Sequence, residues 1–126
     1  MRMKPKIVNA GSLNEYYTPE RCFIAENYGS NDGKVSIAIA RVKPGVTTVA
    51  HHLEGIDEIY IITEGKGVME AKGMEPAEVT VGDVVIIPDG VSQRIKNVGS
   101  VDLVFYCVCT PRFVQERYFS DEPVDK

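Results

Sequence analysis

The sequence predicts an all-β protein with little or no helix. Short apolar runs of strand length recur along the chain, Gly and Pro turn signals separate them, and no segment sustains a helical period. A chain of 126 residues is long enough for one domain that buries roughly two thirds of its unfolded-chain surface. We therefore expect a single domain over residues 1–126, built as a β-sandwich or β-barrel.

Turn signals divide the chain into strand-length segments, for example at residues 29–33 and 88–90. Strands are expected over residues 21–28, 34–43, 46–53, 57–63, 68–72, 78–81, 84–87, 92–97 and 102–109, and a short edge strand is compatible with residues 6–10. Residues 12–19 are polar and turn-like, and 113–119 fit either a last strand or a tail on the surface. The barrel core should run from about residue 20 to 119, with a flexible tail over 121–126.

The stretch over residues 44–67 carries the residues of greatest chemical interest. We expect residues 46–53 and 57–63 to pair as a hairpin, because the short connection between them contains Gly55. If Leu53 pairs with Glu58, alternation places an imidazole and a carboxylate on one apolar face and turns His52 to the other. The residues that would share this face are His51, Leu53, Glu58, Tyr60 and Ile62. A carboxylate in such surroundings requires a partner.

Composition excludes several classes of partner. The chain has 14 Lys and Arg against 18 Asp and Glu, a formal net charge of −4, which argues against nucleic acid and anionic membranes. No apolar run approaches a membrane span, and the first residues lack the apolar part of a signal peptide. The three cysteines form no disulfide framework, so we expect a cytoplasmic location.

Two motifs in the chain resemble those of a known family. Four residues keep the spacing of the first cupin motif: Gly45, His51, Glu58 and Gly65. Four others keep the spacing of the second: Gly82, Pro88, Gly90 and Asn97. At two further positions the family has His, whereas this chain has Leu53 and Gln93. The chain thus resembles a single-domain cupin with degenerate metal-binding motifs, which implies a double-stranded β-helix, or jelly-roll barrel.

The resemblance implies a divalent transition metal, such as Mn, Fe, Ni or Zn, held in the barrel by His51, Glu58 and Gln93. Metal binding should be weakened or absent, because Leu53 has no donor atom and an amide oxygen is a weaker ligand than imidazole. Two alternatives need no metal: His51 can be a buried imidazole hydrogen-bonded to Glu58, and Gln93 can bond to the backbone of a neighbouring strand.

Three functions remain open at this point. The first is a metal-dependent isomerase, decarboxylase or dioxygenase acting on a small oxygen-rich substrate, with Glu58, Tyr60 and His52 as candidates for proton transfer. His52 would need a β-bulge to turn inward. The second is a metal-free cupin in which His51 and a Glu58 of raised pKa bind the ligand or perform acid–base chemistry. The third is a metal-free module that binds or senses a small ligand without catalysis.

Three further features lie outside the cupin motifs. Cys107 and Cys109 lie two residues apart on an expected strand and so share a face. They can form a metal-binding or redox pair, but thiols in such positions are more commonly buried and inert. Arg112 can reach an anionic ligand at the mouth of a barrel or form a surface salt bridge. Residues 35–42 and 103–108 are apolar on both faces, which favours a homodimer.

Overall fold

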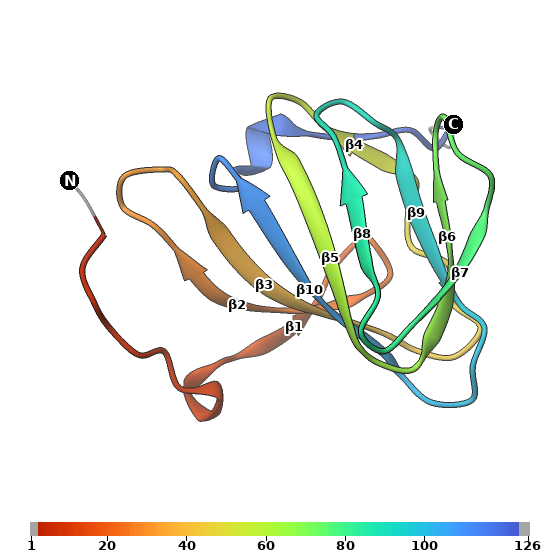
Figure 1. Cartoon of the computed structure of the whole chain (residues 1–126), viewed down its shortest axis with the longest axis horizontal. Coiled ribbons are helices and arrows are strands. Elements are labelled where there is room, and N and C mark those ends of the chain that lie inside the picture. The colour runs from red at the N-terminus through yellow and green to blue at the C-terminus, as the bar shows by residue number, and fades with distance from the viewer. Residues whose placement is uncertain (1–2, 124–126) are drawn as a thin grey trace.

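The computed structural model describes residues 3–123, which form two antiparallel β-sheets facing each other as a barrel (Figure 1). In chain order the strands are β1 (Glu15–Tyr17), β2 (Phe23–Gly29), β3 (Ser36–Val42), β4 (His51–Leu53), β5 (Asp57–Glu64), β6 (Lys66–Ala71), β7 (Ala77–Thr80), β8 (Val84–Ile87), β9 (Gln93–Asn97), β10 (Leu103–Thr110) and β11 (Tyr118–Ser120). Two short 3₁₀ helices, η1 (Ala10–Ser12) and η2 (Gln115–Arg117), complete the described structure. The predicted all-β jelly-roll class is confirmed.

One sheet has six strands in the order β1-β2-β3-β10-β5-β8, and the other has five in the order β11-β4-β9-β6-β7. Alternation along each strand directs one set of side chains into the space between the sheets. On β9, for example, Gln93, Ile95 and Asn97 are buried, whereas Arg94 and Lys96 are exposed. Within residues 3–123, no helix is long and apolar enough to cross a membrane.

One end of the barrel is filled by apolar side chains from both sheets. The residues that fill it expose no more than 1% of their surface: Val42, Ile62, Met69, Ile95 and Leu103. Burying each such side chain stabilises the fold by roughly 1.5–3 kcal/mol. The rings of Tyr60 and Phe105, 4.4 Å apart, lie at the boundary between this packed end and a hollow end.

The predicted hairpin between residues 46–53 and 57–63 is wrong. β4 pairs with β9 and β11 in one sheet, whereas β5 pairs with β8 and β10 in the other. The intervening loop crosses between the sheets and is held by its neighbours, since Glu54 N donates to Arg117 O and Gly55 N to Asp89 Oδ1. His51 and Glu58 therefore face each other across the barrel interior rather than along one sheet.

Several strand boundaries also differ from prediction. Residues 6–10 form no strand, and residues 46–50 contribute only an isolated bridge between Thr47 and Lys96. The hydroxyl of Thr48 bonds to both backbone groups of Ile95, which replaces a regular ladder there. The first part of the predicted flexible tail is held in place, because Asp121 N donates to Ala50 O. Residues 124–126 of that tail lie outside the described residues.

Candidate functional site

A cavity of about 930 Å³ occupies the hollow end of the barrel. His51, Leu53, Glu58 and Tyr60 line its inner part, and other lining residues come from β1, β2, β3, β10, the segment after β10 and the N-terminal segment. A space of this size is in the range of small-molecule sites. The structure thus brings the two main predicted site residues, His51 and Glu58, to one cavity from opposite sheets.

His51 is buried at the start of β4, with 5% of its surface exposed. Its Nδ1 lies 2.8 Å from the carbonyl oxygen of Val49, and because a carbonyl only accepts, Nδ1 carries the hydrogen. The ring stacks on Tyr118 with centroids 4.8 Å apart. In its neutral form the imidazole therefore has one nitrogen fixed as a donor and leaves Nε2 as a free lone pair.

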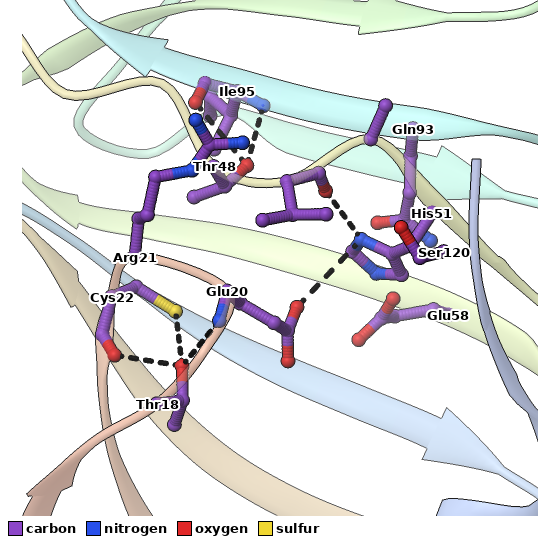
Figure 2. Close-up of polar contacts among 12 residues, drawn as sticks. Thr18, Glu20, Arg21, Cys22, Thr48, His51, Glu58, Gln93, Ile95 and Ser120 are labelled. Carbon is purple, nitrogen blue, oxygen red and sulfur yellow. Dashed lines mark hydrogen bonds and ion pairs between the residues drawn. The ribbon is translucent and has the colours of Figure 1, made fainter. Parts of the chain in front are cut away.

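Glu58 lies beside the His51 ring and exposes 8% of its surface (Figure 2). Its Oε2 accepts a hydrogen bond from the Cys109 thiol at 3.6 Å, whereas its buried Oε1 has no partner among the described residues. Burial raises the pKa of the Glu58 carboxyl, against the smaller lowering effects of His51, the Gln93 amide and the Cys109 thiol. This carboxyl group can therefore hold a proton at pH values where an exposed glutamate has lost it.

Glu20 is a third site residue, which the sequence analysis did not identify. It lies in the connection between β1 and β2, and its Oε2 is 3.6 Å from His51 Nδ1 (Figure 2). Its backbone is fixed on both sides, because its N donates to Thr18 Oγ1 and its O accepts from Val49 N. Burial raises the pKa of the Glu20 carboxyl, and the His51 imidazole opposes this rise. No motif or strand periodicity marks this position in the sequence.

Tyr60 and Gln93 form a buried pair behind the acid and the imidazole. The Tyr60 hydroxyl donates to Gln93 Oε1 across the barrel, and Gln93 is 2% exposed. Burial raises the pKa of the Tyr60 phenol well above its ordinary value, so the phenol keeps its proton. The Gln93 oxygen is thus engaged by a donor, and its amide N–H groups remain to favour the charged form of Glu58.

His52 lies outside the cavity. As the alternation predicts, it points away from the face of His51, and no register shift in the β4–β11 ladder turns it inward. Its Nδ1 is 2.8 Å from Asp121 Oδ1, and its ring stacks on Phe119 with centroids 5.5 Å apart. This geometry offers His52 no route to a ligand in the cavity, so we propose no proton-transfer role for it.

The three cysteines also line the cavity, and all are free thiols. Burial raises the pKa of Cys22 to about 12 and also raises the pKa of Cys107 and Cys109. Because the thiolate is the reactive and metal-binding form, these side chains act as neutral wall groups. Cys109 has a further role as the donor to Glu58.

The donor set does not fit the metal centre that the family motif implies. Leu53 presents only carbon atoms, and the Gln93 oxygen accepts from Tyr60. Over residues 3–123, no three His, Cys, Asp or Glu side chains are arranged to hold an ion. Of the expected ligands only His51 and Glu58 keep free donor atoms at the cavity, whereas structural and catalytic zinc sites use three or more protein ligands.

Comparison with known proteins agrees with this architecture. A family model described as the cupin domain matches residues 38–109, more than half of the chain. The chain belongs to the cupin family. This confirms the resemblance drawn from the two motifs, and the matched cupin region contains all of β4 to β9.

Proteins similar to this cupin are described in different ways. An uncharacterised protein of Methanocaldococcus jannaschii is 37% identical over 83 residues, covering 66% of this chain and 66% of the relative. An oxalate-binding protein of Thermotoga maritima is 39% identical over 71 residues, covering 55% of this chain and 58% of the relative. The structure of KdgF from Halomonas sp. matches with a TM-score of 0.80 at 13% identity, covering 90% of this chain and 99% of KdgF, which supports the fold alone. The chain thus spans less than two thirds of these sequence relatives.

Proposed function

We propose that this cupin binds a small oxygen-rich molecule and transfers protons on it without a metal, with His51 as base and Glu58 as acid. The observation that carries the proposal is the pairing of a free imidazole nitrogen with a buried, partly unpartnered carboxyl group at one cavity. Environments that place an acid and a base side by side and give them different protonation states are typical of proton-transfer sites.

In the proposed reaction, His51 Nε2 removes a proton from a carbon next to a substrate carbonyl. Glu58, in its acid form, gives its proton to the carbonyl oxygen, which produces a neutral enediol. Isomerisation is completed when the imidazolium returns its proton to the neighbouring carbon and the Glu58 carboxylate takes back a hydroxyl proton. If Glu58 instead protonates a leaving hydroxyl group, the same pair eliminates water.

Glu20 supports the charged intermediate of this cycle. When Nε2 gains a proton, His51 becomes a cation whose Nδ1 still donates to Val49 O. The Glu20 carboxylate, 3.6 Å from that nitrogen, then balances the new charge. Stacking on Tyr118 keeps the ring plane fixed while the proton moves.

The test is carbon-bound hydrogen exchange in D₂O, followed by ¹H NMR, on a panel of small hydroxyaldehydes and hydroxyketones with EDTA present. We expect exchange on at least one compound, resistant to EDTA and slowed by roughly 100-fold or more in Glu58→Gln and His51→Gln. Glu78→Gln, an exposed carboxyl on β7, is the control and should exchange as the wild type does. Exchange that EDTA abolishes and Mn²⁺ restores would overturn the proposal, and so would no exchange on any compound.

A second candidate is ligand binding without turnover. The name of the oxalate-binding relative favours it, since 39% identity over 71 residues connects this chain to a protein named for binding alone. The same panel separates the two functions: a compound that raises the melting temperature but shows no exchange supports binding alone.

A further inference from the structure

The two ends of the cavity differ in charge. Its inner part carries the carboxyl groups of Glu20 and Glu58, whereas the lining near β2 and the N-terminal segment includes one carboxyl group, that of Glu26, and three cationic side chains. These three are Lys4, Lys6 and Arg112. A ligand that spans the cavity therefore meets hydrogen-bonding acids at one end and an excess of cationic over anionic side chains at the other.

Arg112 is the cation that the structure fixes most firmly at this end. Its backbone N donates to Gly33 O at 2.9 Å, and its Nη1 donates to Ser30 O at 3.3 Å. Its side chain lies against the bare backbone of β2, because a Cβ added to Gly29 would come within 2.7 Å of Arg112 Nε. A residue larger than glycine at position 29 would displace the guanidinium from this place.

The Arg112 guanidinium has N–H groups that are not hydrogen-bonded within the described structure. It carries five N–H groups, and in the described part of the chain it makes one hydrogen bond and no ion pair with a carboxylate. A fixed, uncompensated guanidinium beside a cavity is suited to a planar carboxylate, which it can bind through two parallel hydrogen bonds.

Two other cavity residues have acceptor oxygens that need a hydrogen-bond donor. Glu58 Oε1 and Asn27 Oδ1 are buried side-chain oxygens without a hydrogen-bond partner among residues 3–123, and both residues line the cavity. Asn27 lies where the β2–β3 register shifts between Glu26 and Tyr28, a bulge that alters the direction of its side chain. A hydroxyl group suits both oxygens, because it can donate to a carboxylate or amide oxygen and can also accept from a protonated Glu58.

From these two ends we propose that the cavity takes small hydroxylated organic acids, with the carboxylate on Arg112 and hydroxyl groups at Asn27 and Glu58. The identity of the reacting end rests on the proposed function, but the acid preference does not. Cys109, whose thiol touches Glu58, is three residues from Arg112, so the Cα atoms of these two residues are roughly 10 Å apart at most. The groups at the two ends of the cavity are therefore carried by neighbouring stretches of backbone.

The experiment compares acids with polyols that carry a hydroxymethyl group in place of the carboxylate. Glycerate, threonate and gluconate are titrated by calorimetry beside glycerol, threitol and sorbitol. We expect at least one acid to bind tenfold or more tightly than its matched polyol. Arg112→Gln should remove that preference, and Gly29→Ala should reduce it while keeping the charge. Arg94→Gln, which breaks an exposed ion pair on β9, is the matched control and should bind as the wild type does.

The proposal is overturned if no acid binds more tightly than its polyol, or if a folded Arg112→Gln protein keeps the full preference. Should Arg112→Gln fail to fold, Gly29→Ala decides, and an unchanged preference in that variant overturns the proposal. Acid binding without any hydrogen exchange would refute the catalytic function and leave the ligand class standing. Hydrogen exchange on neutral hydroxyketones without an acid preference would support the catalytic function and refute the ligand class.

Discussion

Glu58 is a residue whose carboxyl group folding removes from water while leaving one oxygen without a partner. The desolvation that raises its pKa makes it a proton donor and also makes its charged form costly to the folded state. The same property that suits Glu58 to acid catalysis thus reduces the stability of the protein once the carboxyl ionises.

The raised pKa of Glu58 makes the stability of the protein depend on pH, and Glu58→Gln should remove this dependence. With the folded pKa above the unfolded value of 4.5, the folded state holds the proton more tightly, so stability falls as pH rises from 4.5 to the folded pKa. We predict that Glu58→Gln gains stability relative to the wild type across this interval, by at most about 1.4 kcal/mol per pH unit. Urea unfolding from acid to neutral pH measures it, with Glu78→Gln as control. A difference independent of pH would contradict the burial argument.

The sequence identified His51 and Glu58 because the motif spacing marks them, and alternation correctly turned His52 away. It did not identify Glu20, because that residue lies in a loop where neither periodicity nor motif constrains position. It also missed the bond from Tyr60 to Gln93, since that contact joins two sheets and depends on how far apart they pack. The alternation of residues along a strand determines which face a side chain points to, but not which side chains of the other sheet it contacts.

Among the strands, the central error concerns β4 and β5. Both present buried residues at alternate positions, and this pattern is satisfied equally by a hairpin and by two sheets that face each other. The run over residues 84–87, by contrast, was placed with the right bounds, because turn signals close it on both sides. Turn chemistry therefore predicts where strands end, whereas strand partners follow from the whole barrel.

Glu122, which follows β11, connects the two segments that carry Glu20 and His51. Its Oε2 accepts from Arg21 Nη2 and from Ala50 N, so one carboxylate joins the residues next to both site residues. Arg21 has a φ of 69°, an uncommon conformation for a residue other than glycine, which this contact helps to hold.

We predict that Glu122→Ala destabilises the protein by about 1–2 kcal/mol, because it removes one ion pair and one hydrogen bond to the backbone. The loop that carries Glu20 should also exchange its amide hydrogens faster. Urea unfolding and hydrogen exchange measure the two effects, and Glu116→Ala in η2 is the matched control. Wild-type stability in Glu122→Ala would show that the Glu122 carboxylate does not hold the site in place.

The molecule as a whole is a barrel packed at one end and hollow at the other, with an apolar outer surface on the six-stranded sheet. The registers place two rows of apolar residues across β8, β5 and β10. One row is Ile86, Ile59 and Val108, and the other is Val84, Ile61 and Tyr106. Ile86 and Val84 expose 63% and 53% of their surface, which is typical of a face that a second molecule covers.

We therefore predict a homodimer that buries this face. Ile86→Lys should shift the protein to a monomer, because a charge placed within an apolar contact is costly to desolvate. Light scattering after size-exclusion chromatography measures the mass, and Val81→Lys, exposed in the turn after β7, serves as control. A monomeric wild type at micromolar concentration would be contrary to this expectation.

The central claim is that His51 and Glu58 form an acid–base pair rather than the remnant of a metal centre. A long-range ¹H–¹⁵N NMR spectrum tests it directly, since the chain has only 2 histidines to assign. At mildly alkaline pH we predict that His51 carries its hydrogen on Nδ1, and that one equivalent of Zn²⁺ leaves its Nε2 signal unchanged. In the Leu53→His, Gln93→His double variant, which restores the family's ligands, the same addition should shift that signal. A wild-type Nε2 signal that moves on addition of one equivalent of Zn²⁺ would contradict the claim.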